Sequence, residues 1–175
     1  MSVYYHLPSR GAVLDGVVDR LMQEADLPQA PMRWQDWVKE SATRFVRLAE
    51  THPHSFGLFQ LRGISSPDAF RPMEALADSL IRGGFTLDDA WEVVLVFSNY
   101  VVAVGLGLSG FGRRELWAGS IEPAEPRREL MSPEDFPRLH EMDTESVTPA
   151  SIFHRGLEAL INGFEADLRR RRRRQ

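Results

Sequence analysis

"TLDDAWEVVLVFSNYVVAVGLGL", residues 86–108, contains a run from Val93 to Leu108 that is apolar on every side when drawn as a helix. Three structures compete for such a run. It is too short for a membrane span, and polar side chains at 98–100 interrupt it. Its β-branched residues allow a buried strand. A helix buried on both faces is favoured, because Thr86 and Asp89 resemble a capping box at its start.

The segments around this run also have the spacing of helices. Apolar side chains recur every three or four residues in 9–25, 34–50, 66–82 and 149–168. Proline and glycine stand where these helices are expected to begin and end. No stretch has the pattern of paired strands. The sequence therefore predicts an all-α fold.

Residues 110–147 differ from the helical segments because they are polar and rich in proline. Clustered prolines and polar residues between periodic segments are typical of loops. We expect a long, partly mobile connection here, with one short helix near 133–142.

Composition limits the classes of protein that remain. The 175 residues are 43% apolar and 26% charged, which fits one globular domain rather than a disordered chain. The absence of cysteine excludes disulfides, thiol catalysis and cysteine-ligated metals. A cytoplasmic location is the simplest assumption, because a reducing compartment suits such a chain.

The charge is unevenly distributed. Six of the 21 basic residues form one run, 169–174, and without it 15 basic residues face 25 acidic ones. A body this acidic is unlike a nucleic-acid-binding surface. We expect residues 169–175 to form a solvated basic tail, in which arginine suits the negative end of a helix dipole.

No catalytic or cofactor-binding motif is present. The five histidines include no His-Glu-x-x-His pair, and the glycines near residue 107 have neither dinucleotide-binding nor phosphate-loop spacing. His52 and His54 flank a proline beside a helix end, which favours a surface turn over a metal site. We expect no enzyme activity, no metal and no cofactor.

Aromatic side chains are spread over several predicted helices, with few polar groups among them. Plain core packing explains this pattern and is favoured from composition alone. The alternative is an apolar cavity with a few orienting groups. Gln60, Asn99 and the Tyr100 hydroxyl are the candidates for those groups.

The stretch "VYYHLPSRGAVLDGVVDRLM", residues 3–22, resembles the junction between the recognition helix and the connector helix of TetR-type transcriptional repressors. By this resemblance residues 1–8 are the remnant of a recognition helix. Positions that flank or touch DNA phosphate in the family fall on four residues: Tyr4, Tyr5, His6 and Arg10. Phosphate contacts position a protein on DNA, and base contacts specify the sequence. We expect the base-reading helix-turn-helix to be largely missing from this version.

Three more segments resemble the same family in the same order. They are "WQDWVKESATRFVRLAETHP" at 34–53, the central helix at 83–108, and "PASIFHRGLEALINGFEADLRR" at 149–170. The resemblance is nearest to the tetracycline-repressor-like C-terminal subclass. It implies that 9–175 is a ligand-binding and dimerisation domain.

The resemblance also implies a homodimer in which the last two long helices pair with their copies as a four-helix bundle. Gly156 and Gly163 would then permit close approach across the seam. The expected dimer residues are Phe153, Gly156, Leu157, Leu160, Ile161, Gly163 and Phe164.

A ligand pocket is the second implication. Tetracycline-binding members hold a magnesium–drug complex through a histidine near the segment matching "FQLRG", where this chain has Phe59 and Gln60. A metal-free, small apolar effector is therefore expected. The expected pocket residues are Phe45, Phe56, Phe59, Gln60, Met73, Phe97, Tyr100 and Val101.

The function implied is that of a repressor core, released from DNA when the effector binds. Operator DNA is a partner only if a helix-turn-helix precedes this chain, and no membrane partner is expected. The alternative is a stand-alone module that binds a small molecule or another protein without binding DNA.

Overall fold

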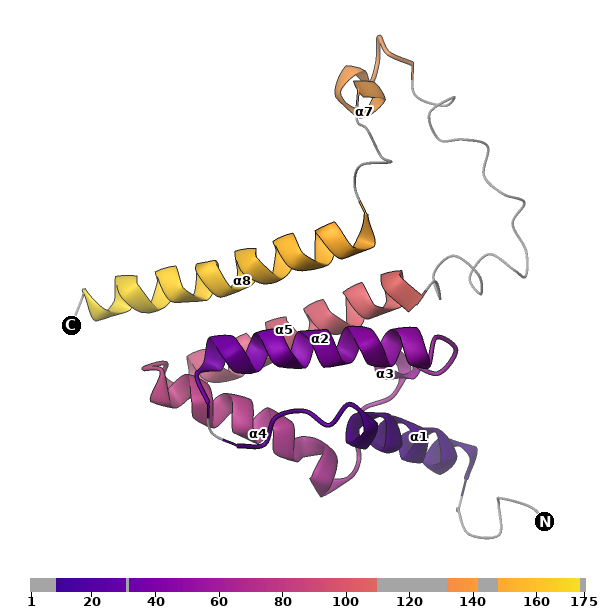
Figure 1. The fold of residues 1–175 in the computed structure, drawn as a ribbon, viewed down its shortest axis with the longest axis vertical. Helices are drawn as coiled ribbons and strands as arrows, with labels where there is room; N and C mark the ends of the chain where they lie inside the picture. The colour runs from indigo at the N-terminus through magenta and orange to yellow at the C-terminus, as the bar shows by residue number, and fades with distance from the viewer. Residues whose placement is uncertain (1–8, 31, 110–131, 142–147, 174–175) are drawn as a thin grey trace.

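The computed structural model describes residues 9–30, 32–109, 132–141 and 148–173, and within these ranges it contains helices and no strands (Figure 1). The predicted all-α fold is confirmed. The apolar run from Val93 to Leu108 is helical from end to end. The helices are α1 (Arg10–Glu24), α2 (Trp34–Thr51), α3 (Leu58–Leu61), α4 (Pro67–Arg82), α5 (Leu87–Ser109), α7 (Pro137–Glu141) and α8 (Pro149–Arg172).

The helices begin where local capping chemistry places them. Ser9 accepts a hydrogen bond from a first-turn amide of α1, and Ser66 accepts one from a first-turn amide of α4. At the start of α5, the Asp89 amide donates to Thr86 Oγ1 at 3.2 Å, and the Thr86 hydroxyl donates to Asp89 Oδ2 at 2.7 Å. Thr148 forms a capping box at the start of α8. These caps satisfy amides that have no partner inside the helix.

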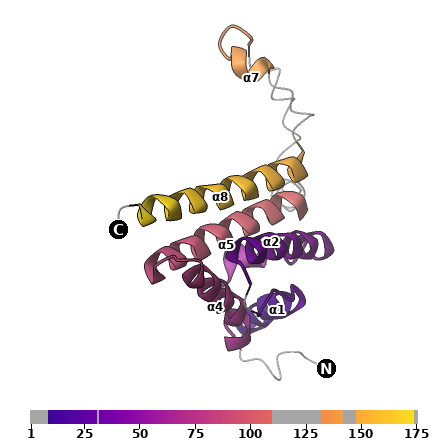
Figure 2. The same cartoon turned by 60° about the vertical axis from the view of Figure 1, so that its left-hand side comes forward.

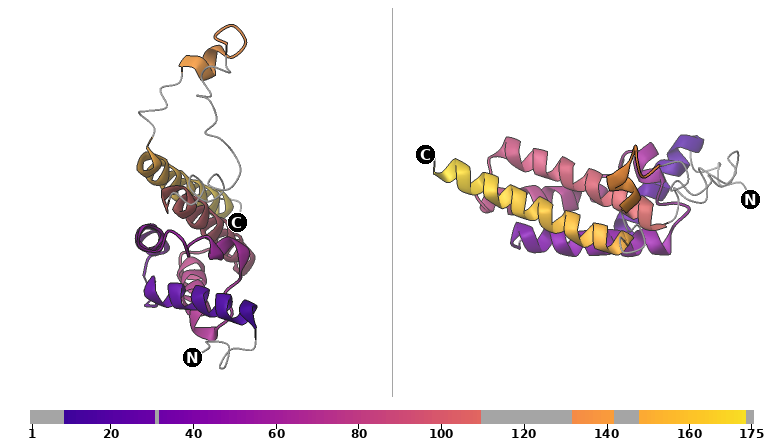
Figure 3. Two further views of the ribbon diagram at one scale, coloured as in Figure 1. Left: turned by 90° about the vertical axis from the view of Figure 1, so that its right-hand side faces the viewer. Right: turned by 90° about the horizontal axis from the view of Figure 1, so that it is seen from above.

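The long helices form a stack. In Figures 1 and 2, α8 lies along α5, α2 and α4 lie on the other side of α5, and α1 lies below them. Figure 3 shows α5 and α8 side by side from above, and they run in opposite directions. The order of the stack agrees with the packing of α5 against α2, α4 and α8, and of α1 against α4.

The core is one continuous apolar cluster contributed by α1, α2, α4, α5 and α8. Trp34 meets Phe85 edge to face, with ring centroids 5.5 Å apart, and Trp37 meets Phe97 in the same way at 5.9 Å. Edge-to-face pairs add specificity to the burial of area. Trp37 therefore helps to fix the rotation of α2 against α5, and Trp34 packs the start of α2 against the turn that precedes α5.

The expectation that α5 is buried on both faces is only half right. One side of α5 is buried in the core, but Trp91 is 53% exposed and Leu95 42% exposed. Among the described residues, Leu87–Leu108 is also the one helical stretch long and apolar enough to cross a membrane, a test that core helices pass too. None of the described elements covers its outer apolar side.

The end of the basic run is docked rather than free. Helix α8 continues to Arg172, whose guanidinium donates to the Gly83 carbonyl at 2.9 Å, and Arg171 pairs with Asp89 at 2.8 Å. Gly84 has φ +101°, and a Cβ there would lie 2.5 Å from the Arg172 guanidinium. These two arginines of the expected basic tail thus tie α8 to the turn between α4 and α5, while their side chains stay exposed.

Parts of the expected connection lie outside the described residues, namely 110–131 and 142–147. The part that is described, 132–141, contains a turn at 133–135 and the short helix α7, in place of one helix over 133–142. Tyr4, Tyr5 and His6 also lie outside the described residues. Arg10 is exposed at the first turn of α1.

Candidate functional site

Three phenylalanines meet where α2, α3 and the turn between them converge. Phe45 lies 6.5 Å from Phe56 and 5.8 Å from Phe59, and Phe56 lies 5.2 Å from Phe59, all as ring-centroid distances in edge-to-face geometry. Phe56 is fully buried. Gly105 of α5 comes so close that a Cβ would lie 2.5 Å from the Phe56 ring. We call Phe45, Phe56 and Phe59 the aromatic cluster.

The other predicted pocket residues are distributed around this cluster. Phe97 packs on Trp37, and Val101 is buried in the core. Met73 is half-buried and lines a separate apolar groove of about 330 Å³ between α4 and α5. Gln60 is exposed. The structure brings three of the eight predicted residues into mutual ring contact.

None of the three polar groups expected to orient a ligand faces the aromatic cluster. Asn99 is exposed and donates to the Leu95 carbonyl at 2.8 Å. The Tyr100 hydroxyl donates to the Phe153 carbonyl at 2.6 Å, and burial raises its pKa, so it stays a donor at neutral pH. Gln60 is exposed as well, and a role for these three groups in orienting a ligand stays a prediction.

A different hydroxyl occupies the core. Ser41 of α2 is 0% exposed, and its Oγ has no hydrogen-bond partner among the residues that the structure describes. It stands three residues after Val38 and four before Phe45, within the buried stripe of α2. A serine among the apolar residues on the buried side of α2 is the feature of the sequence from which this hydroxyl could have been identified. An unpartnered buried hydroxyl costs free energy, so its presence needs a reason.

Four of the seven predicted dimer residues face the chain's own core. Phe153, Leu157 and Ile161 are buried. A Cβ on Gly156 would lie 2.6 Å from the Tyr100 hydroxyl oxygen, so this glycine admits Tyr100 of its own chain. This contact within the chain accounts for a glycine at 156, and close approach to a second subunit there stays a prediction.

The remaining dimer residues leave α8 with a free outer side. Leu160 and Phe164 are half-buried, and Gly163 is exposed with nothing within 4 Å of its Cβ position. Ile152 and Ala159 are exposed on the same helix. The dimer interface stays a prediction, and its natural location is this outer side.

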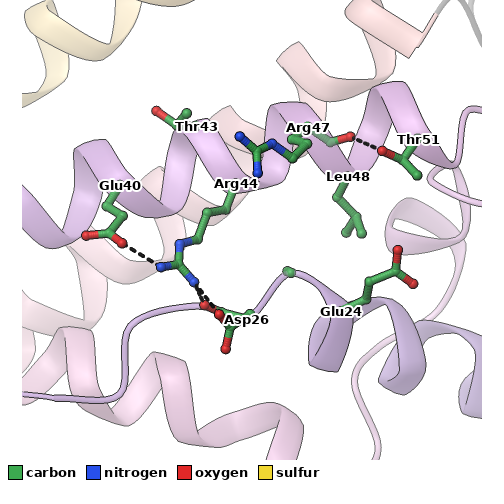
Figure 4. A pocket seen from close by; sticks show the side chains of 9 residues that line it. Glu24, Asp26, Glu40, Thr43, Arg44, Arg47, Leu48 and Thr51 are labelled. Carbon is green, nitrogen blue, oxygen red and sulfur yellow. Dashed lines mark hydrogen bonds and ion pairs between the residues drawn. The ribbon is translucent and has the colours of Figure 1, made fainter.

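A polar groove of about 570 Å³ separates the end of α1 from α2 (Figure 4). Arg44 crosses it, pairing with Glu40 at 2.6 Å and with the Asp26 carboxylate at 2.8 Å, and also donating to the Asp26 carbonyl. These contacts hold Asp26 at φ 46°, which aspartate tolerates. The Asp26 contacts tie the residue that follows the end of α1 to α2, and the Glu40 pair lies within α2, so the charges of Arg44, Glu40 and Asp26 in this groove are accounted for.

The two histidines beside the end of α2 form no metal site. His52 Nε2 lies 2.6 Å from Glu24 Oε1, a contact between the end of α2 and the end of α1. His54 is exposed. Within the described ranges, no group of three or more His, Cys, Asp or Glu side chains is placed to hold a metal ion.

The connector-like helix α1 is fastened to the chain that links α3 to α4. Arg62 forms two hydrogen bonds with the Asp15 carboxylate, at 2.8 and 3.1 Å. One turn later, Asp19 accepts hydrogen bonds from the Ser65 amide at 3.0 Å, the Ser65 hydroxyl at 2.8 Å and the Ser66 amide at 3.3 Å. These contacts join the α3–α4 link to two successive turns of α1.

Acid should loosen the contact between Asp19 and the α3–α4 link. Burial acts to raise the pKa of Asp19, but the hydrogen bonds from Ser65 and Ser66 outweigh it and lower the pKa below its ordinary value of 3.8. The stabilisation is present above that value and is lost as pH falls through the lower, folded-state pKa. Chemical denaturation between pH 6 and pH 3 should show Asp19→Ala losing less stability on acidification than the unaltered chain. Equal losses would remove Asp19 as a contributor.

Comparison with known proteins shows that most of this chain matches a known protein family. Residues 27–168 match the family described as "Tetracyclin repressor-like, C-terminal domain". The chain belongs to this family. The match covers α2 to α8 and so includes the aromatic cluster, Ser41 and the α3–α4 link.

Relatives of known function are transcriptional regulators. The HTH-type transcriptional repressor DrrR1 of Streptomyces coeruleorubidus is 22% identical over 98% of this chain and 67% of its own length. The tetracycline repressor protein class G of Vibrio anguillarum is 25% identical over 94% of this chain and 77% of its own. The domain is thus the ligand-binding domain of a TetR-family regulator, and the expectation that it is not an enzyme agrees with these relatives.

Solved structures show the same fold. ActR of Streptomyces coelicolor, solved in complex with actinorhodin, superposes with a TM-score of 0.76 and 25% identity, covering 95% of this chain and 80% of ActR. Apo ActR gives 0.75 at 26% identity. The tetracycline-repressor-like fold expected from the sequence is confirmed.

Proposed function

We propose that this domain binds a small, largely apolar effector beside the aromatic cluster, and that binding releases the complete regulator from operator DNA. The regulator would act as a cytoplasmic homodimer. ActR, a solved relative, carries actinorhodin, which supports a small-molecule effector for this chain. A ligand acts on such a switch only if it binds the two arrangements of the regulator with different affinity.

The unpartnered Ser41 hydroxyl is the observation on which the effector site rests. Ser41 lies one helical turn before Phe45 on the buried side of α2, so it stands next to the aromatic cluster. Ligand sites combine apolar walls with a few placed polar groups. We infer that the Ser41 hydroxyl gains its partner when an effector separates the rings.

A continuous path of contacts leads from this site to α1. Phe59 of the aromatic cluster belongs to α3, and Arg62 directly follows α3 and holds Asp15 of α1. An effector that displaces Phe59 therefore moves Arg62, and with it the helix that leads toward a DNA reader. The path begins at Phe59, runs through the short helix α3 and ends at the pair between Arg62 and Asp15.

Actinorhodin is a suitable first probe, since it is the ligand of the solved relative. Titration into the chain should quench the tryptophan fluorescence, to which Trp37 of the core contributes, and raise the unfolding temperature in a saturable way. The result should be the same with magnesium and with EDTA, because Phe59 and Gln60 supply no imidazole where metal-binding members have a histidine. Saturable binding that needs magnesium would contradict a metal-free effector.

Ser41→Ala separates a binding role from a packing role. Removing a buried, unpartnered hydroxyl should leave the unfolding free energy unchanged or raise it by about 1 kcal/mol. The same change should weaken the binding of the probe about tenfold, because a ligand hydrogen bond is lost. Denaturant titration and fluorescence titration measure the two effects.

Ser79→Ala is the matched control, since Ser79 is also buried but its hydroxyl already donates to the Ala75 carbonyl at 2.8 Å. It should leave probe binding unchanged. If Ser41→Ala destabilises the chain and leaves binding intact, Ser41 has a packing role and the site lies elsewhere.

A further inference from the structure

A second groove, of about 600 Å³, lies where the start of α2 meets the ends of α4 and α8. Arg33 contributes from α2, Arg82 from α4, and Arg169 and Arg172 from α8. Glu165 is the one acidic side chain among the residues that line it. We call this feature the arginine groove. It lies at the opposite end of α2 from the aromatic cluster.

The guanidinium groups of the arginine groove are unequally neutralised. Arg33 and Arg82 have close carboxylate partners, Asp36 at 2.8 Å and Asp78 at 2.7 Å. Arg169 lies 3.4 Å from Glu165.

The α8 side of the groove carries the least compensated charge. Glu165 Oε1 also accepts from the Gln35 side chain at 2.9 Å, so this carboxylate is shared. Among the described residues, Arg172 donates to a neutral acceptor, the Gly83 carbonyl. Arg169 and Arg172 are three residues apart, hence on one side of α8. Positive charge therefore concentrates there, in a chain whose net charge is −4.

Helix dipoles explain only part of this arrangement. Arg82, Arg169 and Arg172 lie at helix C-termini, where positive side chains are favourable. Arg33, in contrast, lies at a helix N-terminus. It is the N-cap residue of α2, its side chain caps no amide, and the helix end itself is positive. An anion bound in the groove would interact favourably both with the positive end of α2 and with the α8 arginines.

We propose that the arginine groove binds a small oxyanion that carries two or more negative charges, either phosphate-bearing or a polycarboxylate. Guanidinium forks match phosphate and carboxylate oxygens in pairs. The bound anion would bridge α2, α4 and α8 and hold the end of α8 against the α4–α5 turn. This site is separate from the effector site beside the aromatic cluster.

Thermal unfolding at constant ionic strength tests the proposal on the full chain. Pyrophosphate and citrate would each replace sodium chloride at equal ionic strength, because added salt alone screens surface charge. A saturable rise in unfolding temperature with either anion supports the site, and the more effective anion identifies the ligand class. A linear drift, or no rise with both, overturns the proposal.

Single arginine variants locate the binding. Arg169→Gln removes one groove charge while keeping the bond from Arg172 to Gly83, and Arg82→Gln removes the charge on α4. Each should weaken anion binding at least tenfold in isothermal titration. Arg71→Gln is the matched control, because Arg71 is an exposed arginine of α4 in an ion pair with Asp68, outside the groove. Equal weakening in all three variants would show a general charge effect and refute a localised site.

Discussion

Shortening Phe56 to alanine should lower the unfolding free energy by about 3–5 kcal/mol, the range for a large aromatic removed from a packed core. Phe56 is fully buried, and it meets Phe45 and Phe59 edge to face. Its ring also fills the space that Gly105 leaves on α5. One substitution therefore removes contacts among α2, α3 and α5. Urea denaturation followed by far-ultraviolet circular dichroism measures the loss.

Phe70→Ala is the control for Phe56→Ala, since Phe70 is 48% exposed on α4. It should cost less than about 1 kcal/mol, because an exposed side chain loses little on truncation. Similar costs for the two variants would contradict the placement of Phe56 at the centre of the core. Phe56→Leu should recover part of the stability, as it leaves a smaller cavity than alanine.

The helices were predictable because their signals are local. Ser9, Ser66 and Thr148 cap the amides that follow them, and apolar spacing marks the buried side of each helix. Each signal acts over a few residues, so a single sequence contains it. The boundaries of α1, α2 and α4 differ from those expected by one residue, whereas α8 continues four residues beyond 168, to Arg172.

The partners of individual side chains were less predictable because they depend on how helices rotate against one another. The sequence places Gly156 at a subunit seam, yet this glycine admits Tyr100, which precedes it by 56 residues in the chain. Tyr100 in turn was expected to face a ligand. A small difference in the rotation of α5 decides between these roles, and no local pattern records that rotation.

Docking of the arginine run was likewise beyond local reasoning. Charge content predicts a solvated tail, and Arg171 and Arg172 are indeed largely exposed. Their guanidinium groups nevertheless reach Asp89 and the Gly83 carbonyl, because α8 ends beside the α4–α5 turn. Only the antiparallel packing of α8 on α5 brings them there.

The outer side of α5 and α8 is the surface on which we expect a second copy to bind. Trp91 and Leu95 on α5 and Ile152 on α8 are each more than 40% exposed. Gly163 of α8 and Gly107 of α5 have open space at their Cβ positions, so another backbone can approach closely. Water-exposed apolar surface of this kind on a helix pair is typical of an interface. Sedimentation velocity on the complete chain should therefore give a dimer.

Ala159→Glu should raise the dissociation constant of that dimer at least tenfold, which corresponds to about 1.4 kcal/mol or more of association free energy. Ala159 is exposed on the outer side of α8, and a glutamate there would be buried without a partner when two copies associate. Glutamate is nearly as good a helix former as alanine, so α8 itself should persist. Glu158→Lys, an exposed neighbour pointing about 100° away on the helix, should leave the dimer intact. A monomeric chain before any substitution, or a dimer that tolerates Ala159→Glu, would exclude this surface as the subunit interface.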